Sequence, residues 1–187
     1  MDKLIDKVKR ILFTPKTAWD DIKAEESTQT SIIKDYLLYL VAIPIVANFI
    51  GQAIIGYPLR GDRVNFFRGL IWAVFAYVLY QVSLYVSAMV VNALAPQFES
   101  TKNSVAAFKL VAYSSTAALV AGVVAILPSI APLAILGLIY TIYLFYLGLP
   151  VLMETPKEKV VPYTVVSILA IIIISAVIMG IAGAILA

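Results

Sequence analysis

Four long stretches of this chain contain no charged residue, and this feature limits its fold more than any other. Residues 36–59, 69–98, 110–153 and 160–187 contain no Asp, Glu, Lys or Arg. About 20 apolar residues suffice to cross the ~30 Å hydrocarbon layer of a membrane as a helix. The chain is 62% hydrophobic and only 13% charged, with a mean hydropathy of +0.96. The sequence therefore predicts an all-α, polytopic membrane protein.

The third uncharged stretch is long enough for two crossings. Its middle reads LPSIAP, where Pro128 and Pro132 flank Ser129. Proline interrupts a helix, so a tight hairpin is predicted at this point. The chain then has five spans behind two short amphipathic helices, and it divides into an N-terminal segment (1–34) and a transmembrane domain (35–187). The predicted spans are about 35–57, 69–95, 108–127, 132–153 and 160–186.

The distribution of cations predicts the orientation. Residues 1–34 and the loops on the same side contain eleven Lys or Arg residues, whereas the opposite side contains three, Arg60, Arg63 and Arg68. The positive-inside rule places the N-terminus in the cytoplasm and the C-terminus outside. The net charge of +3 indicates attraction to an anionic inner leaflet, so membrane lipids are expected partners and nucleic acid is not.

The residues that most enzymes use are missing or badly placed. The chain contains no Cys and no His, which excludes thiol nucleophiles, thiolate metal sites and imidazole bases. The carboxylates lie in the loops or in the N-terminal segment, and the sequences GxSxG and HExxH are absent. We expect no catalytic residue, no bound metal and no cofactor.

The N-terminal segment is predicted to form two amphipathic helices. In residues 2–12 the apolar side chains recur at helical spacing. Thr14 is expected to cap a second helix whose first residue is Pro15, because proline loses no needed donor there. Trp19 is expected at the headgroup level, with its indole N–H in water.

Two aspartates follow this tryptophan, near the positive end of the second helix. The basic first helix is expected to lie on lipid, and the acidic second helix to project toward the cytoplasm or a protein partner. The alternative is that both helices pack on the inner loops of the protein itself. The candidate interface anchor or partner surface comprises Pro15, Trp19, Asp20 and Asp21.

Three segments are distinctive: TPKTAW, VAYSSTAALV (111–120) and YLFYLGLPVLMETPKEKVVPYTVV (143–166). They resemble the Yip (Ypt-interacting protein) family of five-span membrane proteins in its compact prokaryotic form, and the resemblance covers almost the whole chain. It implies a cytoplasmic N-terminus, five helices and a place in a prokaryotic cytoplasmic membrane. Eukaryotic relatives bind Rab-type GTPases through longer N-terminal segments than residues 1–34, so that function is not carried over. Relatives often have a proline where this chain has Ala117, so no kink is predicted there.

Polar residues inside the spans allow two interpretations. Tyr77, Gln81 and Tyr85 follow helical steps on the second span and face one way. They either form hydrogen bonds that hold the helices together or line a cavity for a small solute or a lipid headgroup. The candidate cavity residues are Asn48, Gln52, Tyr77, Gln81, Tyr85, Asn92, Tyr113 and Ser114.

Small residues and helix breakers form two further patterns. The first comprises two ridges that allow close helix approach, at Ala117, Ala121 and Ala125 and at Ala176, Gly180 and Ala184. Such ridges usually pack within one chain, and the alternative for the fifth span is a homo-oligomer. The second pattern is Gly148 with Pro150, which predicts either a hinge or a simple helix end.

These features favour a non-enzymatic membrane organiser or adaptor that binds lipid or a protein partner through its cytoplasmic face. The alternative is a small channel, transporter or lipid-handling protein that uses the polar residues inside the spans.

Overall fold

A computed structural model describes residues 2–56 and 64–186, with side chains described as far as Gly180. Most of the described residues are helical, and none of them lies in a strand. Five helical segments are long and apolar enough to cross a membrane: Gln29–Ile55, Phe66–Phe98, Ser104–Ile126, Ala131–Leu152 and Lys157–Gly180. The prediction of an all-α protein with five spans is thereby confirmed. The predicted end of the first span at residue 57, Arg60, Arg63 and the side chain of Ala184 lie outside the described part.

Two short helices precede the spans, as predicted: α1 (Asp2–Phe13) and α2 (Pro15–Ala24). The first and second spans contain α3 (Gln29–Ile32), η1 (Ile33–Leu37), α4 (Leu38–Phe49), η2 (Ile50–Ile55), α5 (Phe66–Leu94) and η3 (Ala95–Phe98). The remaining spans contain α6 (Ser104–Ser114), α7 (Thr116–Ala121), η4 (Gly122–Ile126), η5 (Ala131–Ala134), α8 (Ile135–Leu152) and α9 (Lys157–Leu186).

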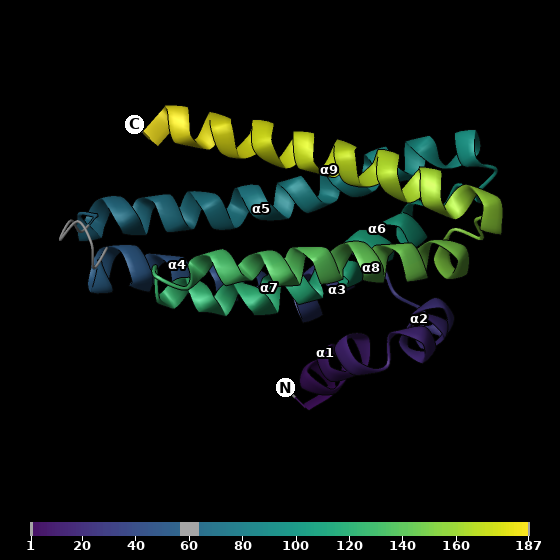
Figure 1. Ribbon diagram of the computed structural model, residues 1–187, viewed down its shortest axis with the longest axis horizontal. Helices are drawn as coiled ribbons and strands as arrows, with labels where there is room; N and C mark the ends of the chain where they lie inside the picture. The colour runs from purple at the N-terminus through teal and green to yellow at the C-terminus, as the bar shows by residue number, and fades with distance from the viewer. Residues whose placement is uncertain (1, 57–63, 187) are drawn as a thin grey trace.

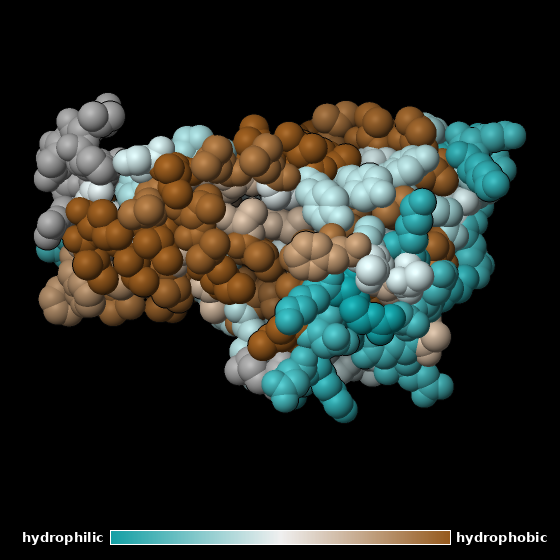
Figure 2. All heavy atoms as spheres, turned by 60° about the horizontal axis from the view of Figure 1, so that its bottom comes forward, coloured by the Kyte–Doolittle hydropathy of each residue, from teal (hydrophilic) through white to brown (hydrophobic). Residues whose placement is uncertain are grey.

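The spans lie side by side in an elongated bundle, with α9 against α5 and α8 against α6 and α7 (Figure 1). We call one end the polar end; it is formed by α2 and by residues 99–103 and 153–156. Teal, hydrophilic residues gather there and over the N-terminal helices, whereas the rest of the visible surface is largely brown and apolar (Figure 2). This distribution is the one expected of a bundle whose apolar sides face lipid.

The first span begins at Gln29, earlier than the predicted start at residue 35. Thr28 and Ser31 form a capping box, in which the Ser31 N–H donates to Thr28 Oγ1 (3.1 Å) and the Thr28 N–H donates to Ser31 Oγ (3.0 Å). These bonds satisfy amides that the first turn of a helix leaves free. The helix can therefore start in polar sequence, ahead of the uncharged stretch.

The third span, Ser104–Ile126, is interrupted inside the predicted range 108–127. α6 ends at Ser114 and α7 begins at Thr116. Ser115 Oγ donates to the carbonyl of Val111 (2.7 Å), and Thr116 Oγ1 donates to the carbonyl of Tyr113 (2.6 Å). Hydroxyls that bond back to their own helix compete with its backbone ladder and bend it. The interruption therefore arises beside Ala117 without a proline.

The hairpin predicted at LPSIAP is confirmed. The helical part of the third span ends at Ile126, and η5 begins at Ala131. Between them, the Ile130 N–H donates to the carbonyl of Leu127 at 3.0 Å and closes the turn. The return helix packs closely, because a Cβ atom at Gly137 would lie 2.7 Å from the carbonyl oxygen of Ala117.

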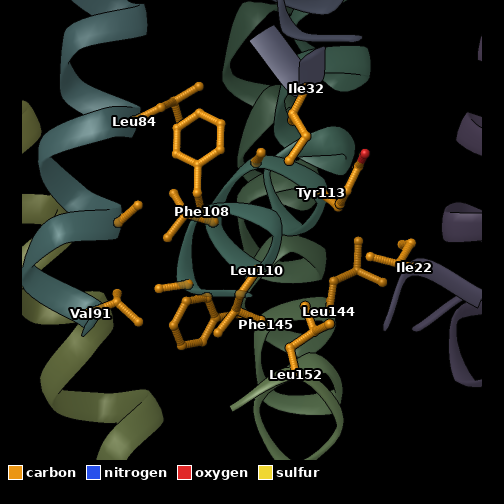
Figure 3. Close-up of a cluster of buried hydrophobic side chains, with 14 of the residues drawn as sticks. Ile22, Ile32, Leu84, Val91, Phe108, Leu110, Tyr113, Leu144, Phe145 and Leu152 are labelled. Atoms are coloured by element: carbon orange, nitrogen blue, oxygen red, sulfur yellow. The ribbon is translucent and has the colours of Figure 1, made fainter. Parts of the chain in front are cut away.

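The buried core is centred on α6. Leu110 is fully buried and Phe108 is 1% exposed. Figure 3 shows side chains from α5, α6 and α8 meeting around them, joined from the N-terminal segment by Ile22. The N-terminal helices are therefore part of the folded core at the polar end.

Candidate functional site

The N-terminal helices dock on the bundle instead of lying free on a lipid surface. The inward faces of α1 and α2 bury Ile11, Ala18 and Ile22, and these helices contact α7 and α8 respectively. Of the two interpretations offered for the amphipathic pattern, the structure therefore shows packing on the protein itself. The packing surface consists of spanning helices, not only of loops.

Trp19 is buried, so its predicted place at the headgroup level is wrong. The side chain is 1% exposed, and its indole nitrogen has no hydrogen-bond partner among the described residues. The ring lies over Gly148 of α8, where a Cβ atom would be 2.9 Å from two ring atoms. The amphipathic pattern identified the apolar face of α2 correctly, but that face turns toward protein.

The corner between α1 and α2 is partly as expected. Pro15 is the first residue of α2, which confirms its predicted position. Thr14 does not cap α2 with its side chain; its Oγ1 donates to the carbonyl of Arg10 at 3.1 Å. The predicted cap is thus wrong, because the hydroxyl closes the end of α1 instead.

Replacing Gly148 by alanine should displace the indole of Trp19 and destabilise the docked α2 by about 1–3 kcal/mol, the usual cost of overpacking. The free energy of unfolding in mixed micelles measures this loss. The matched control is Gly180→Ala, because no atom lies within 4 Å of a Cβ at that position. Equal effects of the two substitutions would contradict the packing role of Gly148.

Lys109 fastens the end of α2 to the bundle. It is 6% exposed, and its Nζ donates to the carbonyls of Ile22 (2.7 Å) and Glu25 (2.5 Å). These carbonyls end a helix, where backbone acceptors are unpaired and a cation is favoured. The predicted third span, 108–127, includes Lys109, but the sequence did not indicate which acceptors its ammonium would bind. Its position directly before the uncharged stretch 110–153 was the signal that it could be buried.

Ion pairs join α1 to α2. Lys7 Nζ lies 2.6 Å from the carboxylate of Glu25, and Arg10 pairs with Asp21. Lys7 Nζ also lies 5.2 Å from the ring centroid of Tyr113 on α6, which is within cation–π range. The predicted acidic character of α2 is therefore used in part to hold α1.

A cleft of about 550 Å³ opens between the N-terminal helices and the bundle, and we call it the N-side cleft. Its floor includes Tyr36 and Tyr113, whose rings meet edge to face at 4.8 Å. Tyr36 is held in place by a 2.6 Å hydrogen bond between its hydroxyl and that of Thr116. The charged lining comprises three cations, Lys3, Lys7 and Arg10, and four carboxylates, Asp6, Asp21, Glu25 and Asp35.

Glu154 fixes α2 to two loops at the polar end. Lys23 Nζ donates to Glu154 Oε1, and Thr101 Oγ1 donates to Oε2, both at 2.9 Å. The hydrogen bond from Lys23 and then that from Thr101 hold the pKa of the Glu154 carboxyl below its usual range. The Glu154 carboxylate, directly after α8, thus links α2 to the loop that precedes α6.

The docking of α2 should weaken in acid. A carboxyl whose pKa is lower in the folded state stabilises that state at neutral pH, and this contribution is lost as protonation proceeds. We expect the protection of the α2 amides against hydrogen exchange, corrected for the intrinsic pH dependence of exchange, to fall as the pH falls through and below the usual glutamate range. Glu154→Gln should show faster exchange at neutral pH and a smaller acid response. If Glu154→Gln lost protection in acid to the same extent as the unsubstituted protein, Glu154 would not be what holds α2.

The candidate polar residues inside the spans do not gather in one cavity. Tyr113 lines the N-side cleft. Asn48 and Gln52 are joined by a 3.0 Å hydrogen bond and line a second cavity of about 450 Å³. Tyr85 and Asn92 line a third cavity, of about 390 Å³.

The other three candidates differ in how their polar atoms are satisfied. Tyr77 donates its hydroxyl to the carbonyl of Leu38 (2.8 Å), and Ser114 donates to that of Val111 (3.2 Å). Both polar atoms of the Gln81 amide are buried without a partner in the described part of the chain. Hydrogen bonding within the bundle therefore accounts for some of these candidates, whereas the amide of Gln81 has no described partner.

The remaining predicted features have clear positions. Asp20 is exposed, and Gly148 and Pro150 lie inside the continuous helix α8, so a hinge there stays a prediction. On α9, Ala176 and Gly180 are exposed and open to a second copy or to lipid. Within residues 2–56 and 64–186, no group of three or more acidic, His or Cys side chains could hold a metal.

Comparisons with known proteins agree on a family. A family model described as the Yip1 domain matches residues 9–179. Inner membrane protein YohC, from two strains of Escherichia coli, is 29% identical over 145 residues, which cover 74% of this chain and 74% of the relative. No solved structure matches the chain.

Proposed function

The chain belongs to the Yip1 domain family, and we propose that it is a non-enzymatic membrane adaptor that binds a protein partner in the N-side cleft. Its five spans make it an integral membrane protein. Two observations support a place in the cytoplasmic membrane with the N-terminus inside. They are the name of its inner-membrane relative and the excess of cations near the polar end.

The charge pattern of the N-side cleft carries the proposal. Its cations and carboxylates nearly balance, and the two ion pairs between α1 and α2 leave Lys3, Asp6 and Asp35 without an ion-pair partner among the described residues. A phosphate headgroup would meet repulsion from the carboxylates. A polypeptide segment with charges of both signs is complementary to this lining and also has apolar groups for Tyr36 and Tyr113.

Lipid contact accompanies this role. Phe13, at the corner between α1 and α2, is 79% exposed, and Ile5 is 46% exposed. Exposed apolar side chains on a basic helix favour insertion at the lipid headgroup level. In this proposal, Phe13 takes the anchoring position that the sequence suggested for Trp19.

The test is capture from native membranes by crosslinking and affinity purification, read by mass spectrometry. Lys3→Glu, Asp6→Lys and Asp35→Lys change the cleft lining without breaking a described ion pair. We expect each to lower recovery of the partner by about tenfold or more, the range for a charge pair of about 1.4 kcal/mol or above at an interface. The matched controls are Lys9→Glu on α1 and Lys16→Glu on α2, which alter exposed charges outside the cleft lining.

Recovery of the same proteins by the cleft variants and the controls would overturn the proposal, as would recovery of none. Charge reversal at Asp20 and Glu26 extends the test to exposed carboxylates on α2 and in the loop that follows it. Reversal at Asp21 or Glu25 is less informative, because it would also break the ion pairs that hold α1.

A small channel or transporter is the second candidate, and the unpartnered amide of Gln81 is the observation that favours it. A buried amide without a protein partner suits a water-filled path. The separation of the other polar residues into different cavities gives this candidate less support. A water-filled path predicts that a cysteine placed at residue 81 is labelled from at least one side of the membrane. Absence of labelling from both sides would count against transport. Flux lost in Gln81 and Asn48 variants whose partner capture is intact would favour transport.

A further inference from the structure

The third cavity, at the polar end of α5, is built differently from the N-side cleft and shares no lining residue with it. Its walls come from α5, α6 and the residues around Lys102. The side toward lipid is apolar, since Met89 is 57% exposed and Tyr85 is 42% exposed. The back wall is Phe108, whose ring centroid lies 6.0 Å from that of Tyr85. One side of this cavity is therefore suited to an acyl chain.

The mouth of the same cavity is polar. Lys102 is exposed and has no ion-pair partner in the described part of the chain. Gln29 donates its amide to the carbonyl of Ser104 at 3.1 Å, which ties the start of α3 to the start of α6. A cation beside this fixed rim, at the end of an apolar wall, matches the position of a phospholipid phosphate.

Asn92 is a cavity-lining residue whose amide oxygen is left without a protein donor. Its Oδ1 atom is buried and accepts no hydrogen bond from any described residue. A buried acceptor without a donor is unfavourable, so an amide that turns its oxygen toward the cavity gains a hydrogen bond when a ligand there supplies an N–H or O–H. The phosphate itself supplies no such donor at neutral pH, whereas an ethanolamine ammonium or a glycerol hydroxyl does.

We propose that this cavity binds one phospholipid of the leaflet at the polar end, with its phosphate on Lys102 and a headgroup N–H or O–H donor on Asn92. Phosphatidylethanolamine and phosphatidylglycerol share this chemistry. Phosphatidylcholine has the phosphate but no donor on its quaternary ammonium, so it is the natural comparison. The site stands independently of the proposed protein partner, because it uses none of the N-side cleft residues.

The test is native mass spectrometry of the full-length protein after incubation with vesicles of one phospholipid at a time, with matched acyl chains. We expect the unsubstituted protein to retain phosphatidylethanolamine, phosphatidylglycerol or both at least about tenfold more than phosphatidylcholine, the change expected for one charge-assisted hydrogen bond. Asn92→Leu should remove this preference. Lys102→Gln should lower retention of all three lipids, because each carries the phosphate.

The matched controls are Gln97→Leu and Lys157→Gln, which change an exposed amide and an exposed lysine near the same end. Both should retain lipid as the unsubstituted protein does. Asn92→Ala, with a check of the melting temperature, separates loss of binding from loss of folding. Absence of any preference over phosphatidylcholine would overturn the proposal, as would a preference that survives in Asn92→Leu. Unchanged retention in Lys102→Gln would also overturn it. Partner capture by Asn92→Leu should be normal, which keeps this result separate from that of the adaptor proposal.

Discussion

Replacing Trp19 by alanine is expected to release the N-terminal helices from the bundle and to lower the free energy of unfolding by about 3–5 kcal/mol. The indole is almost completely buried and fills the space over Gly148 and beside Leu110. Removing it leaves a cavity that α8 cannot close, because helix backbones cannot collapse by the width of a ring. Reversible unfolding by SDS in mixed micelles measures the change.

Amide hydrogen exchange locates the effect of Trp19→Ala. Protection should fall over α1 and α2 while the spans keep theirs, because the indole joins α2 to α8. Trp72→Phe is the matched aromatic control, since Trp72 lies away from the N-terminal helices, on the wall of the second cavity. Full protection of α2 in Trp19→Ala would show that its docking does not depend on the indole.

Lys109→Met is the second substitution for which a large effect is expected. It removes the donor to the buried carbonyl of Ile22 and to the part-buried carbonyl of Glu25, and a buried carbonyl left unpaired costs about 1–3 kcal/mol. Because methionine is apolar and of similar length, packing is largely kept and the loss reports the hydrogen bonds. We expect a decrease of about 2–5 kcal/mol in the free energy of unfolding.

The control for Lys109→Met is Lys34→Met, at an exposed lysine, for which little change is expected. A double substitution gives a sharper result. Trp19→Ala and Lys109→Met both undock α2, so their combined effect should be smaller than the sum of the two. Strict additivity would mean that the two residues hold different structures.

The docked N-terminal segment connects these stability effects to function. Lys109, Trp19 and Glu154 position α2, and the ion pairs to α2 position α1 over the N-side cleft. Variants that undock α2 should therefore lose partner capture together with stability. Lys3→Glu, in contrast, should lose capture alone, because it forms no described ion pair.

Much of the architecture could be predicted from local sequence. The uncharged stretches predicted five spans because the cost of placing charge in hydrocarbon acts on each segment separately. The prolines of LPSIAP predicted the hairpin, and Pro15 marked the start of α2, because proline acts on its own backbone. The apolar face of α2 was likewise visible from its spacing, since Ala18, Trp19 and Ile22 are all buried.

Which surface covers that face was decided only by the tertiary structure. An amphipathic pattern reports that a face avoids water, and lipid and protein satisfy this condition equally. Trp19 could be assigned only once Gly148 was seen to leave room for it, and Lys109 only once the end of α2 was placed above it. The same holds for the polar residues of the spans, which helical spacing places on common faces but which packing divides among separate cavities. Local energies determined which segments enter the membrane, whereas contacts between residues far apart in the chain determined what their side chains do there.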